Sequence, residues 1–157
     1  MRGVRHLVFV VALLLAGVPP LQAKDIAVIV NRGNVSTGLT SAELIKMCKL
    51  NSRKWPGGRD ILIVVRDPSS PEMKLALRKI FGMSAEELKD LISSSPRSHS
   101  ENPAVLIVDS DEVLVKMVAT NPGAIGLVDV YSITGSINVL KIDGKSPLEP
   151  GYTLHGN

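Results

Sequence analysis

Residues 61–71 of the chain read ILIVVRDPSSP. The run of aliphatic residues at 61–65 is typical of a strand covered on both faces, because a half-exposed strand alternates apolar and polar side chains. Ser70 and Pro71 are a common N-cap and first residue of a helix. The stretch therefore predicts a buried strand whose C-terminal end leads through a short polar turn into a helix, the arrangement of an α/β sheet.

The same alternation of strands and helices extends over most of the chain. Strands are expected at 26–30, 61–65, 105–108, 124–128 and 137–142, and helices at 41–49 and 71–81 and after Ser84 and Ser110. Thr40 with Glu43 forms a capping box, and Ser84 with Glu87 forms a second one. The predicted fold class is α/β, with a mostly parallel sheet flanked by helices.

The first 23 residues have the pattern of a cleavable signal peptide. Arg2 and Arg5 precede an apolar run at 7–18, two prolines follow, and Ala23 supplies a small residue before the expected cleavage point. The apolar run is shorter than the roughly 20 residues that span a membrane. We expect an exported, periplasmic protein that is cleaved near Ala23 and is not membrane-anchored once processed.

Charge and cysteine content narrow the function classes. Removing residues 1–23 takes away two arginines and no acidic residue, so that 16 of the 18 basic residues remain beside 15 acidic ones. This near-neutral balance, together with 3% aromatic residues, gives no reason to propose nucleic acid as a partner. Cys48 is the single cysteine, so an internal disulfide is excluded, and we expect a buried apolar thiol rather than a reactive one.

Enzyme and metal-site patterns are absent from the sequence. It has no Gly-x-Ser-x-Gly elbow and no His-Glu-x-x-His motif. His99 and His155 are expected to be solvated. Asp109 and Asp111 flank Ser110 and suggest a metal loop, but acidic residues are also favoured in the first turn of a helix. We predict no enzymatic activity, no metal and no cofactor.

The turn after residues 61–65 is the strongest candidate for a binding site. The first N–H groups of a helix lack intrahelical partners and carry the positive end of its dipole. Arg66, Ser69 and Ser70 add side-chain donors there, so phosphate or sulfate is a reasonable ligand. The alternative interpretation is structural: Ser70 caps the helix, and Arg66 pairs with Asp67 or another neighbour. The residues alone leave both interpretations open.

Several segments in order over residues 25–145 carry a resemblance to a known family. They are residues 26–31, 39–44, 54–56, 66–71, 81–84 and 120–128. Together they resemble the phosphate-type periplasmic substrate-binding proteins of ABC transporters. These proteins have two α/β lobes joined by two crossing strands, and they hold an anion between the lobes. The resemblance implies that this chain corresponds to roughly one lobe.

The resemblance divides the chain into three parts and adds an expected site. It implies a signal peptide at 1–23, a periplasmic-binding-protein-like α/β domain at 24–146 and a loosely ordered C-terminal tail at 147–157. In the family's anion turn, Arg-x-Asp-Gly-Ser-Gly-Thr, Arg66 and Ser70 match the arginine and the serine. The other positions depart from the pattern: Pro68 stands for the aspartate, Ser69 and Pro71 for the glycines, and Glu72 for the threonine.

Two functions follow from these expectations. In the first, the chain is an exported solute-binding-like protein that binds phosphate or a related oxyanion for uptake or sensing, at Arg66, Ser69 and Ser70. Its partners would be an ABC transporter permease or another envelope protein, and a second copy of the chain could complete the cleft as a homodimer. In the alternative, it is a periplasmic interaction module that keeps the binding-protein fold without a ligand.

Overall fold

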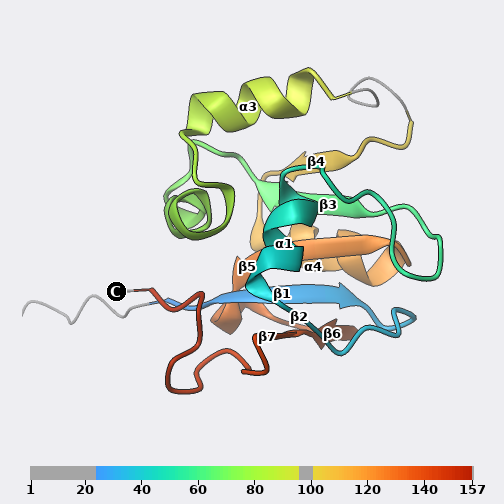
Figure 1. The fold of residues 1–157 in the computed structure, drawn as a ribbon, viewed down its shortest axis with the longest axis vertical. Helices are drawn as coiled ribbons and strands as arrows, with labels where there is room; N and C mark the ends of the chain where they lie inside the picture. The colour runs from blue at the N-terminus through green and yellow to red at the C-terminus, as the bar shows by residue number, and fades with distance from the viewer. Residues whose placement is uncertain (1–23, 96–100, 157) are drawn as a thin grey trace, which may run out of the picture.

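A five-stranded sheet with strand order β4-β3-β5-β1-β6 forms the centre of the molecule (Figure 1). The computed structural model describes residues 24–95 and 101–156. The expected signal peptide and His99 lie outside these residues. The strands are β1 (Ile26–Asn31), β3 (Leu62–Arg66), β4 (Val105–Val108), β5 (Ala124–Asp129) and β6 (Ile137–Val139). A second, two-stranded parallel sheet pairs β2 (Gly38–Leu39) with β7 (Lys141–Ile142).

The sheet is mixed, and four of its five strands run in one direction. β4, β3 and β5 pair in parallel, and β1 runs antiparallel to both of its neighbours, β5 and β6. The prediction of a mostly parallel sheet in an α/β fold is confirmed. Because β1 is reversed, its first residues lie beside the C-terminal end of β5, with Ile26 opposite Asp129. The reversed strand therefore brings the start of the domain to the edge where β3 and β5 end.

Helical segments cover both faces of the sheet. They are α1 (Ser41–Cys48), η1 (Pro71–Met73), α2 (Lys74–Ala76), η2 (Leu77–Phe81), α3 (Ala85–Ser93), α4 (Asp111–Thr120) and η3 (Val130–Ser132). Both predicted capping boxes are present, at Thr40 and at Ser84. The helix predicted over 71–81 is three consecutive pieces, a 3₁₀ turn, a short α-helical stretch and a π-helical end. None of the described helices is long and apolar enough to cross a membrane.

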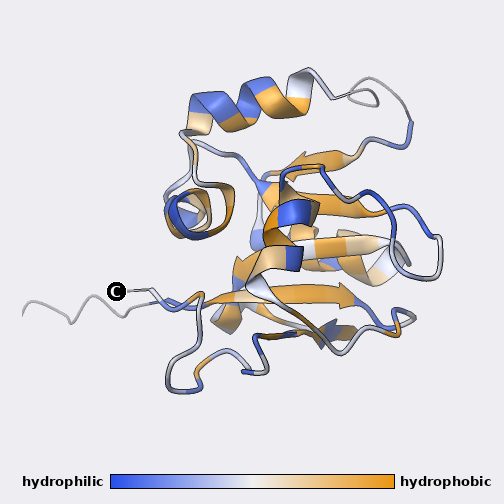
Figure 2. Cartoon of the chain, viewed as in Figure 1, coloured by the Kyte–Doolittle hydropathy of each residue, from blue (hydrophilic) through white to orange (hydrophobic). Residues whose placement is uncertain are grey.

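Two apolar clusters hold the layers together. The larger packs α1, the segment 73–81 and α3 on one face of the sheet, and the smaller packs α4 on the other face. The strands are apolar along nearly their whole length (Figure 2), in agreement with the continuous aliphatic runs. Cys48 is 1% exposed within the larger cluster, which confirms the prediction of a buried thiol, and burial raises the pKa of that thiol to about 12.

The C-terminal segment corrects one prediction. A loosely ordered tail over 147–157 is wrong for its described part, because Tyr152 and Leu154 are 3% and 2% exposed in the main core. Ile26 N–H donates to the Leu154 carbonyl at 3.0 Å, and the Tyr152 hydroxyl donates to the Ile26 carbonyl at 2.8 Å. The His155 side chain is 55% exposed, as predicted, and its Nδ1 is bonded to the buried carboxylate of Asp25. Long-range contacts with β1 therefore order a segment that has no periodic pattern of its own.

Candidate functional site

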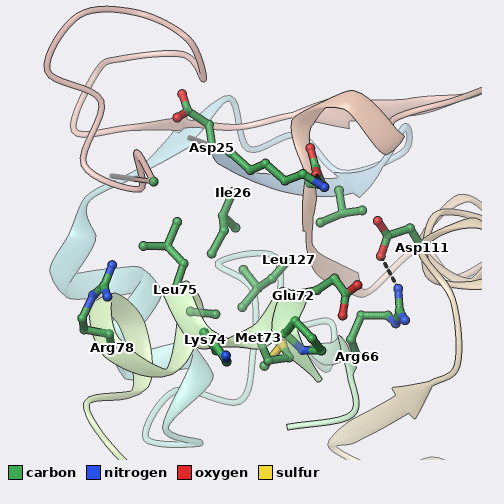
Figure 3. A pocket seen from close by; sticks show the side chains of 16 residues that line it. Asp25, Ile26, Arg66, Glu72, Met73, Lys74, Leu75, Arg78, Asp111 and Leu127 are labelled. Carbon is green, nitrogen blue, oxygen red and sulfur yellow. Dashed lines mark hydrogen bonds and ion pairs between the residues drawn. The ribbon is translucent and has the colours of Figure 1, made fainter. Parts of the chain in front are cut away.

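A pocket of about 320 Å³ opens where β3 and β5 end and β1 begins (Figure 3). Its lining comes from six places in the chain: residues 24–26, Arg66, residues 71–76 with Arg78, Asp111, residues 127–129, and Gly156. The carboxyl ends of strands are where α/β sheets collect their ligands. The reversed direction of β1 adds its first residues to that edge.

Arg66 is the only one of the three predicted site residues that lines this pocket. Its Nη1 donates to Asp111 Oδ1 at 2.7 Å, with the two side chains 19% and 20% exposed. Asp111 Oδ2 accepts a hydrogen bond from the Ser132 hydroxyl at 2.6 Å. Of the two interpretations left open for Arg66, pairing with a neighbour is therefore present, and the neighbour is Asp111 rather than Asp67.

Ser69 is exposed and does not line the pocket; its hydroxyl is bonded to Lys89. Its backbone N–H donates to Asp67 Oδ1 at 2.7 Å, and its hydroxyl accepts from Lys89 Nζ at 2.6 Å. The Ser69 N–H, followed by the Lys89 charge, holds the pKa of the Asp67 carboxyl below its usual range. The structure therefore uses Ser69 to fix the turn, with the help of a lysine from α3.

Ser70 and Arg66 share an unusual property. Within the described residues, the buried side-chain polar atoms that lack any hydrogen-bond partner are Arg66 Nε and Ser70 Oγ. Ser70 occupies the N-cap position of η1, as predicted, but its hydroxyl makes no capping bond. An unpartnered buried donor costs about 1–3 kcal/mol, and native proteins rarely leave one without a reason. Two such atoms lie four residues apart in a single turn.

The other charges at the pocket are partly neutralised. Lys24 Nζ lies 3.0 Å from Asp129 Oδ2; the Asp129 carboxylate, with smaller effects from Asp111 and Glu72, raises the pKa of Lys24. Asp25 is paired with His155. Glu72, Lys74 and Arg78 make no ion pair or hydrogen bond with any described residue. The pocket therefore keeps one free carboxylate and two free cations.

The sequence did not identify most of this arrangement. Two of the charged residues at the pocket are at element ends, Asp111 in the first turn of α4 and Asp129 at the end of β5. Nothing in the sequence indicates that they pair with Arg66 and Lys24. The sequence offers a metal loop or a helix first turn as the role of Asp111; the residue lies in the first turn of α4, and its carboxylate accepts from Arg66 and Ser132. No group of three metal-ligating side chains occurs in residues 24–95 and 101–156. The described residues of the pocket can donate hydrogen bonds and supply positive charge, and they include no nucleophile bonded to a base.

Comparison with known proteins gives matches among solved structures. No protein-family model matches the sequence, and no curated protein matches it. An ABC-type phosphate transport receptor from Vibrio cholerae matches with a TM-score of 0.61 and 21% identity, over 85% of this chain and 54% of that one. PstS from Borrelia burgdorferi matches with a TM-score of 0.67 and 17% identity, over 86% of this chain and 55% of that one.

A third match carries its ligand. A protein assigned as a phosphate ABC transporter substrate-binding protein from Clostridium perfringens, solved with bound phosphate, matches with a TM-score of 0.69 and 22% identity, over 85% of this chain and 53% of that one. At these identities the similarity shows the fold. The chain spans about half the length of the solved structures that it matches, which is consistent with one lobe of such a receptor, as the resemblance implied.

Proposed function

We propose that this chain, which has the fold of one lobe of a phosphate transport receptor, is an exported module that binds phosphate or a related oxyanion. The observation that carries the proposal is the pair of unpartnered buried donors, Arg66 Nε and Ser70 Oγ. They belong to the turn singled out by the sequence and are the two positions that match the family's anion turn. An oxyanion that accepts from both would remove the desolvation penalty that these atoms now carry.

Asp111 supports binding rather than preventing it. Of the Arg66 guanidinium nitrogens, its carboxylate accepts a hydrogen bond only from Nη1. A guanidinium has five N–H donors in a fixed plane. Because the group is planar, holding Nη1 on Asp111 also fixes the direction of Nε. Hydrogen bonds from a charged donor to an oxyanion are about twice as strong as neutral ones, so a positioned Arg66 is the main source of affinity in the proposal.

The cellular role follows from the same proposal. The signal-peptide pattern at residues 1–23 supports export to the periplasm, where the protein would capture an oxyanion for uptake or sensing. An ABC transporter permease or another envelope protein would receive the loaded module. Because binding is strongest where water is excluded, a second copy or a partner chain that covers the pocket would increase affinity.

A titration with oxyanions tests the proposal. Phosphate, sulfate and molybdate are added to the purified protein and the melting temperature is measured. A ligand at 100 times its Kd stabilises by about 2.7 kcal/mol, which corresponds to several degrees for a domain of this size. Arg66→Ala should abolish the shift and Ser70→Ala should reduce it, while Arg53→Ala, an exposed arginine bonded to Leu50, should keep it. No shift with any oxyanion at millimolar concentration contradicts the proposal.

A second candidate function is an interaction module that binds no small ligand. The observation in its favour is that Asp111 already pairs with Arg66, while the free Glu72 carboxylate lies at the same pocket. In that case an envelope protein should be captured by the wild-type chain and equally by Arg66→Ala, and no oxyanion should shift the melting temperature. The two functions therefore predict opposite outcomes for one variant.

A further inference from the structure

We infer that the pocket takes an organic oxyanion, a phosphonate or phosphate monoester with a short apolar body, in preference to inorganic phosphate. The inference rests on the proposed function and names the class of ligand for the same site. It is argued from three properties of the pocket beyond Arg66: its volume, its lining and its charged groups. The volume is larger and the lining more apolar than a free phosphate ion requires.

The size of the pocket is the first argument. Its volume is about 320 Å³, at the lower end of the roughly 300–1,000 Å³ typical of sites for small organic molecules. Since a water molecule takes about 30 Å³, the pocket holds on the order of ten waters. A single phosphate ion at Arg66 would leave most of that volume to water.

The lining is the second argument. Much of the lining is apolar; it includes Ile26, Met73, Leu75, Ala76, Leu127 and Val128. Ile26, Leu75 and Leu127 occupy the middle of the pocket in Figure 3, with Arg66 and Asp111 on one side and Arg78 on the other. Apolar surface of this kind binds apolar groups by releasing water. An inorganic ion would touch none of it favourably.

The charges of the pocket are the third argument. Asp129 and Asp111 are each paired with a cation, Lys24 and Arg66 respectively, and Asp25 is bonded to the His155 imidazole. Of the described charged groups that line the pocket, Glu72, Lys74 and Arg78 have no ion-pair partner, so cations outnumber carboxylates among the unpaired side chains. A pocket with unpaired cationic side chains and an apolar centre matches a ligand with an anionic head and an uncharged body.

The direction of the bound ligand follows from these features. The oxyanion lies at Arg66, where the unpartnered Nε is found, and the apolar body extends over Ile26 and Leu127 toward Leu75. Arg78 stands on the side of the pocket opposite Arg66 in Figure 3, so a body that ends in a polar group is accommodated there as well.

A series of alkylphosphonates tests the inference. We would measure the affinity of the purified protein for inorganic phosphate, methylphosphonate, butylphosphonate and hexylphosphonate by titration calorimetry. Affinity should rise along the series by up to about fourfold per methylene, the equivalent of about 0.8 kcal/mol for each buried CH₂, until the pocket is full. Butanol should not bind, since it lacks the oxyanion.

Two leucines of the same helical segment provide the matched variants. Leu75 and Leu77 are both half-buried against the main core, but only Leu75 lines the pocket. Leu75→Ala should flatten the dependence on chain length, Leu75→Trp should fill the pocket and exclude hexylphosphonate while methylphosphonate still binds, and Leu77→Ala should leave the series unchanged. Melting temperatures of the free variants establish that each is folded.

The outcomes separate this inference from the function on which it rests. If inorganic phosphate binds as tightly as butylphosphonate, the inference is overturned and oxyanion binding stands. If hexanoate binds as well as hexylphosphonate, the pocket selects for a tail and a charge but not for a tetrahedral oxyanion, and the inference is also overturned. If no member of the series binds, the proposed function and the inference are both wrong.

Discussion

The buried polar groups at the two ends of the sheet differ in their hydrogen-bond partners. At one, the Asn31 end (Asn31, Trp55 and Gly123), Asn31 Nδ2 donates to the carbonyls of Val118 and Ala119 at 3.0 and 2.8 Å, and Trp55 Nε1 donates to the Gly123 carbonyl at 3.0 Å. At the other, the Arg66 end (Arg66, Ser70 and Asp111), side chains pair with side chains and two buried donors have no partner.

This difference indicates which end of the sheet has its hydrogen bonds satisfied within the protein and which end has donors left for a ligand. Backbone carbonyls are partners whose positions the sheet and α4 already determine, so the Asn31 end is fully satisfied without any ligand. The Arg66 end keeps two unsatisfied donors among the described residues, and one of them belongs to Arg66, which lines a pocket. Such exceptions concentrate at functional sites. Substitutions should therefore affect stability at the Asn31 end and binding at the Arg66 end.

Gly123→Ala should have the largest effect on stability. A Cβ at this position would lie 2.2 Å from the Asp60 carbonyl oxygen, and relief of that contact requires the backbone to move. We expect a loss of about 3 kcal/mol, with oxyanion affinity unchanged in the folded protein, measured by urea unfolding and calorimetry. Gly57→Ala is the matched control, since nothing lies within 4 Å of its Cβ. A loss below about 1 kcal/mol would show that the Asn31 end is less rigid than its packing implies.

The core between the two ends should respond to high pH through Cys48. Its thiol has a pKa of about 12 in the folded protein against 9.0 for the reference thiol. From pH 9 upward the unfolded chain loses this proton and the folded chain keeps it, so stability falls by up to about 1.4 kcal/mol per pH unit. Cys48→Ala should make the slope between pH 9 and 11 shallower. An unchanged slope in this variant would mean that the thiol ionises without unfolding.

The Arg66–Asp111 pair should contribute a smaller coupling. A double-mutant cycle with Arg66→Ala and Asp111→Asn should give about 1.5 kcal/mol, because both side chains are about one-fifth exposed and solvent weakens the pair. Urea unfolding of the four proteins measures it. Asp111→Asn should also weaken oxyanion binding, since the carboxylate positions the guanidinium. Tighter binding in this variant would mean that Asp111 competes with the ligand instead.

The fold could largely be predicted because its signals are local. Aliphatic runs such as 26–30 and 61–65 marked the strands within a residue or two, and Thr40, Ser84 and Ser110 each cap a helix as expected. The direction of β1 and the burial of Tyr152 and Leu154 could not be predicted in this way. Both depend on partners about one hundred residues away or more, at β5 and β1 respectively.

The candidate site was predictable only in part. Arg66 is at the pocket because strand ends gather there, a rule that needs no knowledge of its partners. Its pairing with Asp111 spans 45 residues, and Ser69 turns to Lys89 on α3, 20 residues away. No spacing rule connects such residues, so the sequence singled out the turn but did not indicate which of its donors are occupied.

Glu72→Gln should produce the smallest change, an increase in oxyanion affinity of about threefold with no change in stability. Glu72 is exposed, has no partner among the described residues and lines the pocket beside Arg66, so its charge opposes an anion across solvent with a modest, salt-dependent energy. The gain should shrink in 0.5 M salt, and Glu86→Gln, on the exposed first turn of α3, is the matched control. If Glu72→Gln weakens binding, the Glu72 carboxylate accepts a hydrogen bond from an O–H of the ligand, and the Arg66 end then recognises a protonated oxyanion rather than a fully ionised one.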